Sequence, residues 1–321
     1  MAVTDAAANM EAMDMASRTV TDWRLRTRTL ALGQRTLVMG VVNITPDSFS
    51  DGGLYFAPEA AVEHALQLLD EGADLLDLGA ESTRPGSRAG GDAPVVSADE
   101  EQARLLPVLE GVLKRRPDAI VSVDTYKAST ARAAMKAGAE IVNDVSGLTW
   151  DAEMAAACSE AGTGLVLMHT RGMPGEWSTQ EQLAPDALLG AVRSGLANSL
   201  ALASAAGIAA EEIVLDPGYG FGKRFGENYA LLARQSSLLS LGRPLLVGLS
   251  RKSFLGYRLA KHVGDGDDAQ APREARENAS LAAMTAAILQ GASIVRVHAV
   301  RAAVDAAQVA DAILGAAAGR L

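Results

Sequence analysis

Eight short apolar runs recur along the chain, and each one ends at a polar residue. Runs of about four to eight residues that are rich in Val, Ile and Leu are typical of β-strands buried on both faces. Stretches long enough to form helices separate them, so we expect parallel strands with helices packed outside. The polar residues that end the runs are Asn43, Glu81, Asp124, Asn143, His169, Asp216, Ser250 and His298.

Eight strands that alternate with helices indicate one architecture, the eight-fold β/α barrel, whose chemistry takes place where the strands end. The predicted fold class is α/β, a (β/α)8 TIM barrel. Its strands are predicted at 37–43, 74–78, 120–124, 141–143, 164–168, 212–215, 244–249 and 293–297.

The chain ahead of the barrel predicts two further features. Residues 22–36 alternate in polarity and contain a turn at Leu32-Gly33-Gln34, which indicates an N-terminal β-hairpin covering the barrel bottom. Residues 1–20 are predicted to be a flexible tail. Because no linker or shift in composition follows, we expect one domain over 21–321.

Capping residues mark several helix boundaries. Ser97, with Glu100 three residues later, predicts the start of one helix by a capping box, and Gly138 predicts the end of the next. A long segment at 252–272 is expected before the penultimate helix. The other helices are predicted at 58–71, 186–206, 226–240 and 273–290, with a last one closing the chain.

Composition narrows the range of partners. The net charge of −10 disfavours nucleic acid and acidic membrane surfaces, although a local group of cations can still bind a small anion. No apolar run approaches the ~20 residues that span a bilayer, so no membrane segment is expected. The acidic N-terminus does not resemble a signal peptide. Cys158 is the only cysteine, which excludes a disulfide framework and makes the cytoplasm the expected location.

The last apolar run carries a candidate anion site. Arg296 and His298 are two residues apart and therefore share one face of their strand. A guanidinium buried in a barrel needs an anionic partner. That partner is either an acidic residue of a neighbouring strand or an anion bound at the rim. Phosphates bind near the last strands of such barrels, which favours the rim site.

Asp124, Asn143 and Asp216 end three other runs and can converge at the same rim. Carboxylates and amides suit a ligand rich in N–H donors, since each accepts paired hydrogen bonds. Structural capping of a strand end is the alternative for any one of them, and three together weaken it.

Lys252 follows the seventh run in a polar turn, which favours a cationic hydrogen-bond donor over a Schiff-base lysine embedded in its strand. Ser253 stands where a helix begins, and the N–H groups there can hold a carboxylate or phosphate. The glycines of 216–223 lack the P-loop pattern and can admit a flat ligand against Phe221. Asn43 and the carboxylates of the rim suit Mg²⁺ held partly by substrate phosphates, whereas no pattern predicts zinc.

Motifs in all eight strand regions resemble those of the dihydropteroate synthases, a pterin-binding family of folate biosynthesis. The most specific are GVVNITPDSFSDGG at 40–53 and SRKS at 250–253. The others are DLGAESTRPGS at 77–87, SVDTYK at 122–127, IVNDVSG at 141–147, LMHTRGMP at 167–174, LDPGYGFGK at 215–223 and IVRVH at 294–298.

The resemblance implies a reaction between two small molecules. The amine of p-aminobenzoate attacks the methylene of 6-hydroxymethyl-7,8-dihydropterin diphosphate, which gives 7,8-dihydropteroate and diphosphate with Mg²⁺ as cofactor. It also implies a homodimer. Two alternatives remain: an enzyme like the methyltetrahydrofolate:corrinoid methyltransferases, and a non-catalytic pterin-binding paralogue.

Matching the motifs position by position implies the role of each site residue. The pterin residues are Asp124, Asn143, Asp216 and Lys252, and the p-aminobenzoate residues are Thr83, Pro85, Phe221 and Ser253. The diphosphate residues are Asn43, Arg296 and His298, with Asn43 also a metal ligand. Catalytic roles fall to Lys252, Asp47, Arg84 and Asp216.

The chain departs from the family pattern in four places. Ala299 stands where many relatives have Asp, the second loop contains the extra stretch SRAGGD, and GMPGEWSTQEQ at 172–182 differs from the commoner sequence. The N-terminal tail is additional. None of these changes removes a residue assigned above.

Overall fold

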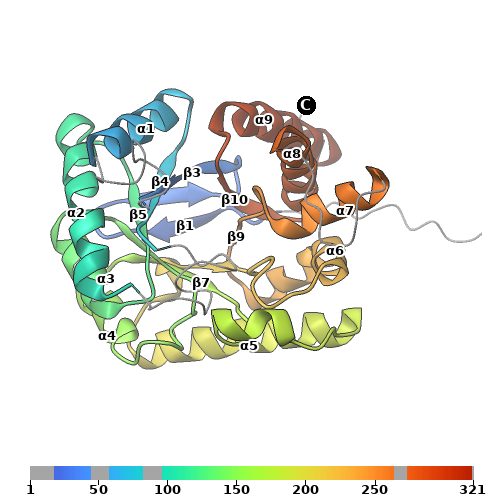
Figure 1. Cartoon of the computed structure of the whole chain (residues 1–321), viewed down its shortest axis with the longest axis horizontal. Coiled ribbons are helices and arrows are strands. Elements are labelled where there is room, and N and C mark those ends of the chain that lie inside the picture. Colours follow the sequence, from blue (N-terminus) through green and yellow to red (C-terminus); the bar gives the residue numbers. More distant parts are fainter. Residues whose placement is uncertain (1–17, 45–57, 82–95, 264–272, 320–321) are drawn as a thin grey trace, which may run out of the picture.

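The computed structural model describes residues 18–44, 58–81, 96–263 and 273–319. Eight parallel strands form a closed barrel, and helices surround it (Figure 1). The predicted TIM barrel is therefore confirmed, and each predicted strand overlaps an observed one. The strands are β3 (Leu37–Asn43), β4 (Leu75–Gly79), β5 (Val121–Asp124), β6 (Ile141–Asp144), β7 (Gly164–Met168), β8 (Ile213–Asp216), β9 (Leu245–Val247) and β10 (Ala292–Val297).

Helices connect successive strands on the outside of the barrel. The longer ones are α1 (Pro58–Asp70), α2 (Ala98–Arg115), α3 (Ala128–Lys136), α4 (Met154–Ala161), α5 (Pro185–Ala205), α6 (Gly226–Ala233), α7 (Ser253–Val263), α8 (Arg273–Leu289) and α9 (Val300–Ala317). Short 3-10 helices are η2 (Pro174–Thr179), η3 (Ala210–Glu212) and η4 (Gln235–Leu241). No helix in the described ranges is long and apolar enough to cross a membrane.

The capping residues mark helix boundaries as predicted. The Glu100 N–H donates to Ser97 Oγ at 3.1 Å, so Ser97 caps α2. The Glu100 side chain pairs with Arg104 one turn along the helix. After α3, Gly138 takes a φ of +111°, a left-handed conformation that costs glycine little.

One helix prediction was wrong. The helix expected at 226–240 is divided into α6 and η4. The segment expected at 252–272 contains α7, which begins at Ser253. The division has a tertiary cause. Gln235 is fully buried, accepts a hydrogen bond from Tyr219 Oη at 2.9 Å, and donates to the Ala287 carbonyl of α8 at 2.9 Å.

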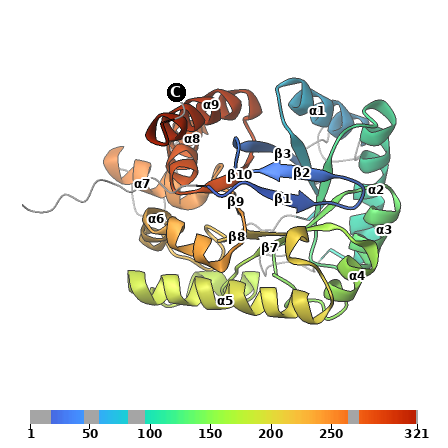
Figure 2. The same cartoon turned by 180° about the vertical axis from the view of Figure 1, so that it is seen from behind.

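The N-terminal hairpin pairs β1 (Thr21–Arg24) with β2 (Thr29–Leu32) and lies across the barrel bottom (Figure 2). The hairpin is confirmed, but the turn predicted at Leu32-Gly33-Gln34 was wrong. The chain turns at Leu25–Arg28, where the Leu25 N–H donates to the Arg28 carbonyl at 2.8 Å. Gly33, with a φ of +91°, redirects the chain after the hairpin, and a Cβ there would lie 2.4 Å from the Thr19 carbonyl oxygen.

The hairpin closes one end of the barrel with apolar side chains. Trp23 is fully buried, and its indole N–H donates to the Glu212 carbonyl at 2.8 Å. Gly164 leaves space for Leu25 of the hairpin, because a Cβ at Gly164 would lie 2.5 Å from Leu25 Cδ2. With Leu32, these side chains pack on inward residues of the strands, which are Leu37, Met39, Leu75, Ile141, Val166, Val214, Leu246 and Ile294. Polar side chains of the barrel interior therefore gather at the opposite end.

The predicted N-terminal tail lies mostly outside the described residues, and its boundary stays a prediction. Arg18, the first described residue, is anchored to the barrel. Its guanidinium donates to Asp311 Oδ1 of α9 at 2.5 Å and to Thr36 Oγ1 at 2.8 Å.

Candidate active site at the carboxyl ends of the strands

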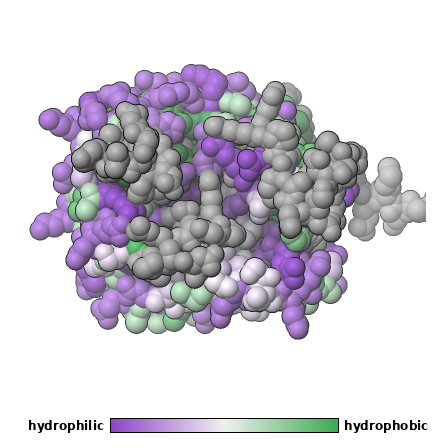
Figure 3. Space-filling view, viewed as in Figure 1, coloured by the Kyte–Doolittle hydropathy of each residue, from purple (hydrophilic) through white to green (hydrophobic). Residues whose placement is uncertain are grey.

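The sequence-predicted residues in the described ranges meet at the carboxyl end of the barrel. Figure 1 looks onto this end, and Figure 3 shows hydrophilic residues near the centre of the same face. Asn43, Asp124 and Asp216 are the last residues of β3, β5 and β8, while Asn143 lies in β6 and Arg296 in β10. Asp47, Thr83, Arg84 and Pro85 lie outside the described residues.

The centre of the site is an ion-paired network around Arg296. The Arg296 Nε–H donates to Asp77 Oδ2 at 2.5 Å, and its NH2 group donates to Asp124 Oδ2 at 2.8 Å. Asn143 Nδ2 donates to Asp77 Oδ2 at 3.0 Å. The internal ion pair considered for Arg296 is therefore present. Its role in binding an anion stays a prediction.

Burial and charge set the protonation of this network. Burial raises the pKa of Asp124 to about 7, because it outweighs the attraction of Arg296 and is reinforced by the Asp77 carboxylate. Burial alone would lower the pKa of Arg296, but Asp77 and Asp124 raise it, so the guanidinium stays charged. Near neutral pH, Asp124 can therefore change its charge beside a permanent cation.

Asp77 is the residue of this network that sequence reasoning missed. It is 0% exposed, and its Oδ1 has no hydrogen-bond partner among the described residues. One signal was present. Asp77 is a carboxylate inside an otherwise apolar run, and a buried charge of that kind needs a partner.

A second group joins β3, β9 and β10. Asn43 Nδ2 lies 3.5 Å from His298 Nε2, and His298 Nδ1 lies 3.0 Å from Ser250 Oγ. Ser250 Oγ also accepts the His298 backbone N–H at 3.3 Å. The contact with Ser250 orients the His298 ring toward Asn43, so two residues predicted for the diphosphate site are neighbours.

The turn after β8 is held by a buried lysine. Lys223 Nζ donates to the carbonyls of His169, Gly218 and Phe221 at 3.0, 2.7 and 3.2 Å. Burial lowers the pKa of Lys223 well below its usual value. Asp216 accepts the Gly218 N–H at 2.7 Å, and burial raises the pKa of Asp216. Lys223 belongs to the motif at 215–223, but nothing in its local sequence indicated that three backbone carbonyls would accept hydrogen bonds from its ammonium group.

Lys252 and Phe221 face one another across the rim. Lys252 Nζ lies 3.9 Å from the centroid of the Phe221 ring, a cation–π contact. The preceding residue, Arg251, has a φ of +59°. Its N–H donates to Ser280 Oγ at 3.0 Å and its guanidinium pairs with Glu277 at 2.6 Å, so α8 holds this strained turn. Ser253 then begins α7, as expected.

His169 has a structural role. It is buried, its Nδ1 has no partner in the described part of the chain, and burial with the nearby Lys223 lowers its pKa to about 2. The ring is therefore neutral and packs on Gly195 of α5, where a Cβ would lie 2.4 Å from His169 Cδ2.

The metal expectation depends on Asn43. The described residues contain no group of three or more His, Cys, Asp or Glu side chains placed to hold a metal ion. Asn43 contacts His298 through its Nδ2 group, which leaves the amide oxygen of Asn43 for other contacts. One protein oxygen suits Mg²⁺, which keeps several waters and binds substrate phosphates.

Comparison with known proteins identifies the family. The pterin binding enzyme family matches residues 39–298. The dihydropteroate synthase of Bacillus subtilis is 40% identical over 89% of this chain and 91% of its own. That of Mycobacterium leprae is 43% identical over 87% and 94%.

Solved structures agree. The Xanthomonas albilineans dihydropteroate synthase with 4-aminobenzoic acid has a TM-score of 0.78 and 39% identity over 92% of this chain and 99% of that one. The Yersinia pestis dihydropteroate synthase with a sulfonamide drug has a TM-score of 0.78 and 38% identity over 92% and 100%. The chain therefore belongs to the pterin-binding enzymes and, within them, to the dihydropteroate synthase family.

Proposed function

We propose that this chain condenses 6-hydroxymethyl-7,8-dihydropterin diphosphate with p-aminobenzoate, giving 7,8-dihydropteroate and diphosphate. The observation that carries the proposal is the convergence of acceptors from β5, β6 and β8 beside the Lys252–Phe221 contact at one end of the barrel. A relative crystallised with 7,8-dihydropteroate has a TM-score of 0.75 and 36% identity to this chain, which supports the same product here.

The pterin binds among Asp124, Asn143, Asp216 and Lys252. Its aminopyrimidinone edge presents several N–H donors, and a carboxylate accepts such pairs well. Asp216 is buried, and Asn143 is oriented by its hydrogen bond to Asp77. These contacts orient the methylene that reacts.

p-Aminobenzoate packs its ring on Phe221 and directs its carboxylate to Ser253 at the start of α7. Free N–H groups of a helix N-terminus favour an anion there. Lys252 adds positive charge between the ring and the pterin, since its ammonium group already lies over the Phe221 face. Thr83 and Pro85 are assigned to this pocket by their motif positions.

The diphosphate binds at Arg296, His298 and Asn43. The Asn43 oxygen, together with the substrate, would hold Mg²⁺, which would supply positive charge to stabilise the leaving diphosphate. The group of Asn43, His298 and Ser250 supports this placement, because it fixes a polar surface beside Arg296.

The reaction needs no covalent enzyme intermediate. The amine nitrogen forms a bond to the pterin methylene, the bond from that carbon to the diphosphate oxygen breaks, and the ammonium proton is lost. Lys252 and Asp216 orient the pterin and stabilise its developing charge, and Asp47 and Arg84 are assigned catalytic roles through their motifs. The contribution of the chain is orientation and electrostatic stabilisation.

Two further features belong to the proposal. A homodimer is typical of the family, and light scattering of the purified protein tests it. A cytoplasmic location fits a single buried thiol, Cys158, in place of disulfides.

Diphosphate release tests the function directly. With both substrates and Mg²⁺, we expect release that stops when p-aminobenzoate is omitted. Release that does not depend on p-aminobenzoate, or none at all, would contradict the proposal. Methyl transfer from methyltetrahydrofolate to a corrinoid protein would instead establish the first alternative, and tight pterin binding without turnover would establish the second.

A further inference from the structure

Phe221 is held on more than one side before any substrate binds. Lys252 Nζ lies 3.9 Å from the ring centroid. The ring of Trp177 lies 5.1 Å away, centroid to centroid, at an interplanar angle of 84°, which is the edge-to-face arrangement that aromatic pairs favour. Trp177 lies in η2, within the segment 172–182 whose sequence departs from the family pattern.

Trp177 is itself well fixed. Its side chain lies in the rim with only 8% of the residue exposed. Its indole N–H donates to Thr170 Oγ1 at 3.1 Å and to the Gly172 carbonyl at 3.2 Å. Tryptophan has two side-chain torsions, so hydrogen bonding at one end and ring packing at the other leave it little freedom.

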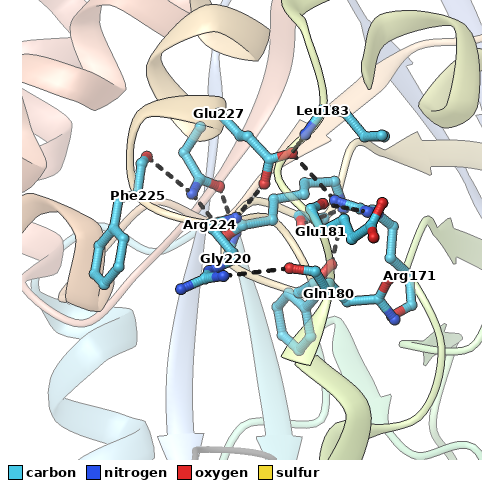
Figure 4. Close-up of polar contacts among 12 residues, drawn as sticks. Arg171, Gln180, Glu181, Leu183, Gly220, Arg224, Phe225 and Glu227 are labelled. Atoms are coloured by element: carbon cyan, nitrogen blue, oxygen red, sulfur yellow. Dashed lines mark hydrogen bonds and ion pairs between the residues drawn. The ribbon is translucent and has the colours of Figure 1, made fainter. Parts of the chain in front are cut away.

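The segments that carry Trp177 and Phe221 are joined through Glu227 of α6. The Glu227 side chain is 1% exposed and accepts from Arg171 NH1 at 3.1 Å, from the Leu183 N–H at 2.7 Å and from the Arg224 N–H. Figure 4 shows this carboxylate between Leu183 and Arg224, with Arg171 reaching the same group. The segments that follow β7 and β8 at the rim of the barrel are therefore connected to each other.

The backbone of Phe221 is fixed by the same connected segments. Its carbonyl accepts from Lys223 Nζ at 3.2 Å, and the Gly220 N–H donates to Asn228 Oδ1 of α6 at 2.7 Å. The ring therefore has a fixed base, and Trp177 fixes the remaining rotation. A ring already in its bound orientation costs less ordering when a substrate packs against it.

We propose that Trp177 is a positioning residue for p-aminobenzoate. It acts through Phe221, by holding the ring in the orientation on which the substrate ring packs. The inference rests on the proposed function, in which Phe221 is the wall of that pocket. It predicts a larger effect on p-aminobenzoate than on the pterin, because the pterin residues Asp124 and Asn143 are held by a different network, that of Arg296 and Asp77.

Steady-state kinetics of Trp177→Ala tests the proposal. We expect the KM for p-aminobenzoate to rise about tenfold, equivalent to about 1.4 kcal/mol. The KM for the pterin diphosphate and kcat should stay within about twofold. Trp177→Phe keeps an aromatic edge and should recover most of the affinity, whereas Trp177→Leu fills space without that edge and should resemble Trp177→Ala.

Trp150 provides a matched control. Its ring makes a similar edge contact, at 5.1 Å and 75°, with Tyr126 instead of Phe221. Trp150→Ala should therefore leave the KM for p-aminobenzoate unchanged. If Trp177→Ala does not fold, Trp177→Leu against Trp177→Phe gives the same comparison.

Three results would overturn the proposal. They are an unchanged KM for p-aminobenzoate in the Ala and Leu variants, an equal rise in both KM values, and no recovery with Trp177→Phe. In each case the wild-type chain still releases diphosphate, so the proposed function survives. A wild-type chain without p-aminobenzoate-dependent release would overturn the function and this inference together.

Discussion

Replacement of Asp77 by Asn is the sharpest test of the network below the pterin site. Asp77 is 0% exposed and accepts from Arg296 at 2.5 Å and from Asn143 at 3.0 Å. Asn has nearly the same shape, so the variant removes a charge while creating no cavity. Arg296 then keeps Asp124 as its anionic partner, and the orientation of Asn143 is weakened.

The expected cost follows from the burial of the pair. Removing one partner of a buried ion pair typically costs about 3–5 kcal/mol. Arg296 retains Asp124, and its side chain is 20% exposed, so the lower end applies. With an unfolding entropy of about 2.1 cal/mol/K per residue, a loss of about 3 kcal/mol lowers the Tm of this chain by about 4–5 °C.

The pH dependence of the free energy of unfolding gives an independent test of the same network. The pKa of Asp124, about 7, lies above the usual 3.8 of an aspartate, so the folded chain binds a proton between these values that the unfolded chain has lost. The free energy of unfolding should therefore fall as the pH rises from 3.8 toward 7 and become flat above it. Asp77→Asn removes a charge that raises this pKa, so the dependence should shift to lower pH.

Urea unfolding across this pH range, with scanning calorimetry at neutral pH, measures both effects. Glu160→Gln is the control, because the Arg132–Glu160 pair is exposed, at 39% and 65%, and such pairs contribute about 0–1 kcal/mol. A Tm for Asp77→Asn equal to that of the control, together with an unchanged pH dependence, would refute the assigned network.

Three other substitutions test separate parts of the molecule. Lys252→Ala should reduce kcat at least about a hundredfold with an unchanged Tm, whereas Lys136→Ala, on the exposed face of α3, should change neither. Arg296→Lys keeps the positive charge beside its two carboxylates but loses the forked donor. Calorimetry should therefore show a larger loss of affinity for the pterin diphosphate than for the free pterin, and equal losses would contradict the anion site. Trp23→Ala should lower the free energy of unfolding by about 3–5 kcal/mol in urea while both KM values stay unchanged.

The barrel could be predicted because its strands are apolar on both faces and end at polar residues. The hairpin turn could not. Leu25–Arg28 contains none of the residues that mark a tight turn, and tertiary contacts hold it instead. The Thr27 N–H donates to Glu140 Oε2 at 2.9 Å, and Arg26 Nε donates to the Ala139 carbonyl at 2.9 Å. The sequence pattern favoured a turn at Gly33. Glycine is required there because another part of the backbone passes close by, and not because the hairpin turns there.

The same limit applies to the site, because contacts between segments far apart in the chain are not visible in the sequence. A polar residue at a strand end is visible in the sequence, which is why Asn43 and Asp216 could be placed at the rim. Asp77 and Arg296 are 219 residues apart, and their pairing follows only from closing the barrel. Trp177 carried no signal as a site residue, because its partner Phe221 belongs to a different loop and only the packing of the two loops brings the rings together.

Arg296 shows why the two interpretations of a buried cation are compatible. In the unliganded chain its guanidinium is held between Asp77 and Asp124, so its charge is already balanced. The raised pKa of Asp124 makes that balance adjustable near neutral pH. A pterin edge that donates to Asp124 shares that carboxylate with Arg296, which weakens the hold on Arg296 and strengthens its attraction for a diphosphate. The two halves of the substrate should therefore bind cooperatively, and free pterin together with free diphosphate should bind more tightly than either alone.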